Sequence, residues 1–325
     1  MTIFNGGASC FYYPTRVMFL DDNRAFLDAL ELELSAHIRM LTFTDTKDVL
    51  HALDNSHQPI TSLSFKPLNN VNTDTSTDCL VGFKMSNLLN FIYDGSRFNY
   101  TPVIVVDYQM PNINGIEFCQ QLKSKDIFKI MLTAEADKDT AIKAFNDGII
   151  DKFILKTSEN LFQELLGAVD ELTARHFREM SYPIINAYNG APNLLNEELF
   201  KQLFNTVYLK ANAVEYYMLD ISGSFLFLDK SGNPTWLVVR HAIELKEQLD
   251  FLQGYDAPEE IISSIAKKEK MLILLAEEEY LKPIAEWFTY IFDSKKLDDN
   301  YCYSIIEGRL TDSVRWNEIV PYDSL

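Results

Sequence analysis

The sequence of 325 residues has few cysteines, no long apolar run and a shortage of positive charge. Its cysteines show neither a CxxC pair nor the spacing of metal ligands, which indicates free thiols in a reducing compartment; they are Cys10, Cys79, Cys119 and Cys302. No apolar run approaches the ~20 residues of a membrane-spanning helix. The N-terminus lacks the basic and apolar segments of an export signal. We therefore expect a cytoplasmic protein without a membrane partner.

Acidic residues dominate the charge of the chain. There are 47 Asp and Glu residues against 29 Lys and Arg residues, and the net charge is -18. A field of that sign repels nucleic acid and anionic lipid, although it leaves room for a local basic patch. The composition is 47% hydrophobic and 23% charged, which is typical of globular proteins, and the length suffices for two domains.

The first half of the chain alternates short apolar strands with amphipathic helices. Strands are predicted at 16–20, 38–44, 103–107, 128–133 and 151–155, and a long helix from about 158 to 180. This alternation is typical of an α/β domain with a parallel sheet. Residues 55–77 are rich in Asn, Ser, Thr and Pro without a period, so we expect an insertion near 55–95 within a domain that spans 15–180.

The second half changes character. Residues 1–14 are expected to be an N-terminal extension, and residues 181–195, which contain two prolines, a linker. Residues 196–325 combine helices with strands joined by the turns "DISGS" and "DKSGNP", which predicts a separate α+β domain. Residues 183–325 contain 13 Lys or Arg and 23 Asp or Glu and no recognisable helix-turn-helix, which argues against a DNA reader.

Polar side chains follow the strands of the predicted sheet. Asp21 and Asp22 follow the first strand, and the other strand ends carry Asp107, Thr133 and Lys156. Because parallel strands bring their carboxyl ends to one edge, these side chains form a predicted site. Converging carboxylates suit Mg²⁺, and a hydroxyl with a lysine suits a phosphoryl group. Each residue alone has another explanation: the acids as helix caps, the threonine as a strand former, the lysine as a surface charge.

The segments "FLDDN", "VIVVDYQMPNINGIEF", "MLTAEAD" and "DKFILK" resemble the receiver domain of bacterial two-component response regulators, over residues 15–178. The resemblance implies a flavodoxin-like doubly wound parallel sheet and a phosphoacceptor, Asp107. It implies Mg²⁺ ligands, with Asp21 acting through water, at Asp21, Asp22, Asp107 and the carbonyl of Gln109. It assigns switch and phosphate-binding roles to Thr133, Lys156 and Phe153, and tuning of dephosphorylation to Gln109 and Glu135.

Three departures from the family pattern concern this site. Thr157 stands where the family usually has proline after the lysine, and the switch aromatic is Phe153 rather than Tyr. The interval between Asp22 and Asp107 is also about twice the one expected of the family, because of the insertion. These departures leave open an alternative, a pseudo-receiver that docks partners without phosphorylation.

The resemblance further implies a sensor histidine kinase or phosphotransfer protein as partner, a phosphorylation-dependent homodimer, and a signalling switch rather than an ordinary enzyme. For residues 196–325 three hypotheses stay open: an interaction or dimerisation module, a nucleotide or small-molecule binder, and an atypical nucleic-acid binder for which "AKKEKM" is the one basic hint. The two-domain layout loosely resembles quorum-sensing response regulators of the Lqs type, which implies control of growth phase or virulence traits.

Overall fold

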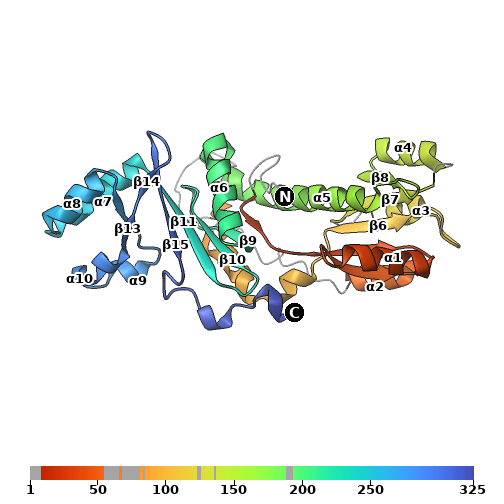
Figure 1. Cartoon of the computed structure of the whole chain (residues 1–325), viewed down its shortest axis with the longest axis horizontal. Coiled ribbons are helices and arrows are strands. Elements are labelled where there is room, and N and C mark those ends of the chain that lie inside the picture. Colours follow the sequence, from red (N-terminus) through yellow and green to blue (C-terminus); the bar gives the residue numbers. More distant parts are fainter. Residues whose placement is uncertain are drawn as a thin grey trace. The chain divides into compact units, whose positions relative to one another are not determined.

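The structure is a computed structural model that describes residues 9–54, 66–67, 81–82, 85–122, 126–134, 137–187 and 193–325. The chain forms two compact units, and neither is continuous in the sequence (Figure 1). The parallel-sheet unit consists of Pro14–Ser62 and Gly95–Met180. The antiparallel-sheet unit consists of Met1–Tyr13, Leu63–Asp94 and Ser181–Leu325.

The parallel-sheet unit has five strands in the order β3-β2-β6-β7-β8. Their bounds are Arg39–Phe43 for β3, Arg16–Leu20 for β2, Val103–Asp107 for β6, Phe128–Thr133 for β7 and Lys152–Leu155 for β8. All neighbouring strands pair in parallel. This strand order is that of the flavodoxin-like doubly wound fold, which confirms the predicted fold class.

Among the described residues, five helices cover the two faces of this sheet. They are α1 (Arg24–Leu34), α2 (Thr46–Asp54), α3 (Gly115–Gln121), α4 (Lys138–Asn146) and α5 (Leu161–Ala187). Side chains of α1 and α5 pack on Val103 and Val105, whereas those of α2, α3 and α4 pack on Ile104 and Val106. Because successive residues of a strand point to opposite faces, a strand buried on both faces must be apolar throughout, as β6 is until Asp107.

The antiparallel-sheet unit is built on six strands in the order β1-β9-β10-β11-β15-β14. Their bounds are Phe11–Tyr12, Ala213–Met218, Phe225–Asp229, Pro234–His241, Tyr301–Glu307 and Lys295–Lys296, in that order. Helix α6 (Glu198–Lys210) packs on this sheet through Phe204, whose ring centroid lies 4.9 Å from that of Tyr216 and 5.0 Å from that of Phe225. The α+β character predicted for the second half agrees with this sheet.

The antiparallel-sheet unit also holds a smaller cluster around Trp287. It contains α7 (Ala242–Gly254), α8 (Glu259–Ala266), α9 (Glu277–Tyr280), α10 (Ile284–Trp287), and the paired strands β12 (Lys270–Leu272) and β13 (Ile291–Asp293).

A second strand pair joins β4 (Lys66–Pro67) to β5 (Val81–Gly82). The 3-10 helices in the described part of the chain are η2 (Met85–Tyr93), η3 (Gly95–Asn99), η6 (Asn193–Asn196), η7 (Phe288–Tyr290), η8 (Trp316–Glu318) and η9 (Tyr322–Ser324). Among the described helices, none combines the length and apolar character needed to cross a bilayer.

The unit boundaries differ from those expected from the sequence at three places. Residues 11–12 of the expected extension are strand β1, paired with Tyr216 and Tyr217 of β9. The described residues 85–94, at the end of the expected insertion, belong to the antiparallel-sheet unit, where the N–H of Val320 donates to the carbonyl of Ile92 at 3.0 Å. The expected linker at 181–195 begins too early, because α5 continues to Ala187. Composition reports local preference, whereas these boundaries depend on pairing between distant segments.

Candidate functional site

Three carboxylates meet at the carboxyl ends of two neighbouring strands. Asp21 and Asp22 follow β2, Asp107 ends β6, and the two strands pair directly. One carboxylate oxygen from each residue lies within 4.8 Å of the others. Asp21 and Asp107 are 1% and 5% exposed, while Asp22 is exposed to solvent. The predicted convergence of the acids is therefore what the structure shows.

The local structure shows why these acids are not caps of α1. That role belongs to Asn23, whose side chain accepts the N–H of Phe26 at 3.2 Å. Asp21 instead accepts the N–H of Asn23 through Oδ1, which leaves Oδ2 turned to the cluster. The capping explanation for Asp21 and Asp22 is therefore not the one that the structure supports.

Lys156 binds two of the three carboxylates. Its Nζ lies 2.7 Å from Oδ2 of Asp21 and 2.9 Å from Oδ1 of Asp107. The side chain is 26% exposed, and Nζ lies 4.8 Å from the ring centroid of Phe26. The backbone sets its position, because the N–H of Lys156 donates to the carbonyl of Thr133 at 2.9 Å.

Burial and neighbouring charges shift the pKa values of Asp107 and Lys156 within the cluster. Burial raises the pKa of Asp107 above its ordinary value, and the hydrogen bond and charge of Lys156 oppose that effect. Burial disfavours the Lys156 ammonium, but its hydrogen bonds to Asp21 and Asp107 outweigh burial and raise the pKa of Lys156. The single ammonium of Lys156 cannot balance the charge of three carboxylates. The atoms that could coordinate a cation here are all hard oxygens. The residues present thus fit Mg²⁺ or a similar divalent cation.

Thr133 lies at the same sheet edge, at the end of β7, and is fully buried. Its hydroxyl donates to the carbonyl of Ala134 at 3.3 Å rather than to an acid. A hydroxyl can rotate at little cost, so Thr133 can donate to a ligand that enters beside Asp107.

Gln109 and Phe153 both point toward α4. The Gln109 side chain donates to Oδ2 of Asp137, which precedes α4, at 2.6 Å. The ring of Phe153 meets the edge of the Phe145 ring of α4 at 6.5 Å between centroids. Sequence reasoning did not find the bond between Gln109 and Asp137, because nothing local signals it. The predicted residue Glu135 lies outside the described residues.

Gly115 is a further site residue that sequence reasoning did not assign. A Cβ at Gly115 would lie 2.2 Å from the backbone carbonyl oxygen of Asp107, so only glycine lets α3 begin this close to the acid. The N–H of Gly115 also donates to the carbonyl of Tyr108 at 2.9 Å. The glycine at the end of the motif "MPNING" was the available signal.

Residues 90–169 match the family model of the response regulator receiver domain. The chain contains a receiver domain. The match includes Asp107, Thr133 and Lys156 and confirms the receiver resemblance over three of the four motifs, whereas Asp21 and Asp22 lie before the matched residues. Because the parallel-sheet unit carries this domain, we refer to it as the receiver unit.

The whole chain is similar to the structure of the response regulator LqsR of Legionella pneumophila. The TM-score is 0.79 at 25% identity, and the match covers 97% of this chain and 94% of that chain. A receiver domain protein of Clostridium thermocellum (18% identity, TM-score 0.33) covers 50% of this chain and 95% of its own. An adenylate cyclase of Rhodopirellula baltica (18% identity, TM-score 0.35) covers 53% of this chain and 95% of its own. No curated protein matches the sequence.

Proposed function

We propose that this protein is a response regulator switched by phosphorylation of Asp107, with a sensor histidine kinase or phosphotransfer protein as donor and Mg²⁺ as cofactor. The contact of Lys156 with both Asp21 and Asp107 carries the proposal. A buried carboxylate held by an ammonium beside two further acids suits transfer of a phosphoryl group better than it suits structural stability, since burying such charges is costly.

The proposed reaction transfers one phosphoryl group. An oxygen of Asp107 attacks the phosphorus of a phosphohistidine, the P–N bond breaks, and its electron pair stays on the imidazole nitrogen. Lys156 then places its charge against the phosphoryl oxygens, and the Thr133 hydroxyl rotates to donate to one of them. Asp21, Asp22, Asp107 and the carbonyl of Gln109 would hold Mg²⁺, which supplies positive charge against the phosphoryl oxygens.

The residues around the acid are proposed to set its lifetime and output. Gln109 and Glu135 tune hydrolysis of the acyl phosphate, and Phe153 couples Thr133 to the face of α4. That face exposes Ile142 and Phe145, the latter at 47%, beside Phe153. We propose that a second copy of the chain covers it after phosphorylation, which makes the protein a phosphorylation-dependent homodimer.

The remaining assignments rest on the whole chain. The motifs of the receiver and the likeness to LqsR support a cytoplasmic signalling protein, rather than an enzyme, that acts in quorum sensing. The antiparallel-sheet unit, which holds the output domain, would pass on the signal without a helix-turn-helix.

Intact-mass spectrometry tests this function. The full chain is incubated with acetyl phosphate and Mg²⁺ as wild type, as Asp107→Asn, and as Asp28→Asn, an exposed acid of α1 that serves as control. We expect one added phosphoryl group on wild type and Asp28→Asn, none on Asp107→Asn, and none with a chelator. An equal gain on Asp107→Asn would refute the acceptor. No gain from either acetyl phosphate or a phosphorylated histidine phosphotransfer protein would favour the pseudo-receiver.

A further inference from the structure

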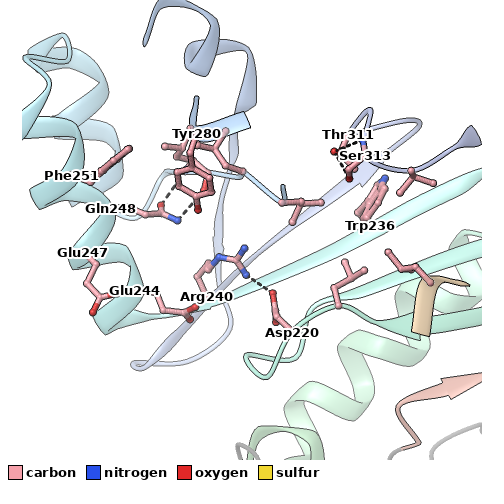
Figure 2. A pocket seen from close by; sticks show the side chains of 16 residues that line it. Asp220, Trp236, Arg240, Glu244, Glu247, Gln248, Phe251, Tyr280, Thr311 and Ser313 are labelled. Atoms are coloured by element: carbon pink, nitrogen blue, oxygen red, sulfur yellow. Dashed lines mark hydrogen bonds and ion pairs between the residues drawn. The ribbon is translucent and has the colours of Figure 1, made fainter. Parts of the chain in front are cut away.

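A cavity of about 610 Å³ lies in the antiparallel-sheet unit, between α7, strand β11 and residues 311–314 (Figure 2). Its volume is in the range of small-molecule sites, roughly 300–1,000 Å³. All the lining residues belong to this one unit, so the cavity does not depend on the receiver unit or on Asp107.

Three aromatic side chains line the cavity, Trp236, Phe251 and Tyr280. Trp236 is fixed by a hydrogen bond from Nε1 to the carbonyl of Gly308 at 2.8 Å. Phe251 stacks on Trp287 with 4.9 Å between ring centroids, and Tyr280 stands half exposed beside it. Leucines from β12 and the segment after it complete the apolar lining. Trp236 is 1% exposed, so it supports the wall from behind. Phe251 is half-buried and held in place by Trp287, and with Tyr280 it can contact a flat molecule.

Arg240 is the polar centre of the cavity, and its side chain is 11% exposed. Its Nη1 donates to Asp220 at 2.9 Å, to Ser224 at 3.1 Å and to the carbonyl of Val239 at 2.8 Å. Among the described residues, Nε and Nη2 have no partner, and neither atom is sealed off as a buried unpaired group. Figure 2 shows the guanidinium inside the ring of lining side chains, bonded to Asp220 on one side. The open edge of a guanidinium offers two parallel donors, which match two neighbouring acceptors.

The charge of the lining excludes most anions. Asp220 already balances Arg240, and the Glu244 carboxylate accepts the N–H of His241 at 2.6 Å and the Ser222 hydroxyl at 2.9 Å. Glu247 is exposed at the rim, and within the described chain its carboxylate has no partner. A ligand here meets two free donors at Arg240, a free acceptor at Glu247 and flat apolar walls.

We propose that this cavity binds an uncharged planar heterocycle of the guanine type. Guanine carries two neighbouring acceptors, O6 and N7, which arginine binds through two hydrogen bonds. Its opposite edge carries N–H donors for Glu247, and its face stacks on Phe251 or Tyr280. The negative lining favours a nucleobase or nucleoside over a nucleotide with several phosphate charges. This names a ligand class for the output domain and stands apart from phosphorylation of Asp107.

Isothermal titration calorimetry of the full chain with guanosine tests the proposal. Adenosine is the matched comparison, because it has a donor where guanine has O6, and guanosine 5′-monophosphate adds only charge. We expect saturable binding of guanosine, binding of adenosine weaker by about 10-fold or more, and no gain from the phosphate. Absence of guanosine binding, equal binding of adenosine, or tighter binding of the monophosphate would each overturn the proposal.

Three variants test whether guanosine binds in this cavity. Arg240→Lys keeps a positive charge beside Asp220 but lacks the two-donor edge, so we expect guanosine binding to fall about 10-fold. Glu247→Gln is an exposed change that should weaken binding several-fold while leaving the melting temperature unchanged. Arg315→Lys is the control, since Arg315 pairs with Glu318 outside the cavity lining. Undiminished binding by both Arg240→Lys and Glu247→Gln would place guanosine elsewhere and refute the site.

Discussion

The ammonium of Lys156 lies 2.9 Å from Oδ1 of Asp107 and bridges it to Asp21, at 2.7 Å. These contacts connect the ends of β2, β6 and β8, three strands that are far apart in the sequence. The same bridge sets one ammonium against two buried carboxylates and provides a cation for a phosphoryl group.

Replacing Lys156 by Met should destabilise the protein by about 2–4 kcal/mol, because it leaves Asp21 and Asp107 buried without a cation. Urea titrations at pH 7 measure the loss, and added Mg²⁺ should restore more stability to this variant than to wild type. The control is Lys152→Met, whose partner Glu171 is exposed; it should cost less than about 1 kcal/mol. Equal effects of the two substitutions would contradict a structural role for the Lys156 bridge.

Replacing Gly115 by Ala should displace Asp107, since the new Cβ would lie 2.2 Å from its carbonyl oxygen. We expect a loss of stability of about 1–3 kcal/mol, as for other overpacked sites, and slower phosphorylation by acetyl phosphate. Gly167→Ala is the matched control: it lies in α5 with no atom within 4 Å of the added Cβ. That variant should be unchanged or more stable by up to about 1 kcal/mol. A fully active, equally stable Gly115→Ala protein would show that the backbone yields freely there.

His176 should make the receiver unit sensitive to acid. Burial lowers the pKa of this histidine from 6.5 to about 4, and its Nε2 has no partner among the described residues. Between those pH values the unfolded chain binds a proton that the native state does not, so stability is fully present above pH 6.5 and is lost as pH falls toward 4. The loss amounts to about 3 kcal/mol.

Substituting His176 by Phe should remove that part of the pH dependence, because Phe fits beside Tyr100 and Phe177 and carries no proton. Urea titrations at several pH values compare this variant with wild type and with His37→Gln, a change at an exposed histidine. If His176→Phe and wild type lost the same stability on acidification, the histidine would not be the responsible group.

Phe145→Ser should weaken the phosphorylated dimer by about 10-fold or more, because it removes a large apolar side chain from the proposed interface on α4. Sedimentation velocity with acetyl phosphate and Mg²⁺ measures the dimer. Leu32→Ser removes a more exposed apolar side chain from α1 and should leave the dimer unchanged. The opposite pattern, with Leu32→Ser weakening the dimer and Phe145→Ser without effect, would move the interface to α1.

The sequence predicted the parallel sheet and most of the site. Strand β6 is apolar until Asp107. An acid at this position is informative, because a charge in a strand that is buried on both faces is costly and therefore indicates a functional role. Since parallel strands bring their carboxyl ends together, strand periodicity alone placed Asp21, Asp22 and Lys156 beside it. The close approach of Gly115 and the bond between Gln109 and Asp137 depend on loop paths that periodicity does not report.

What the sequence by itself determined is therefore the identity and edge of the receiver site, because each strand end carries its own local signal. Only the tertiary structure decided which segments form the second unit. Phe11 pairs with Tyr217 although some two hundred residues separate them, and Ile92 joins Val320 in the same unit. Such pairings arise from burial and backbone hydrogen bonding between distant segments, which no local composition encodes. The Arg240 cavity, assembled from β11, α7 and later segments, belongs to the same class of feature.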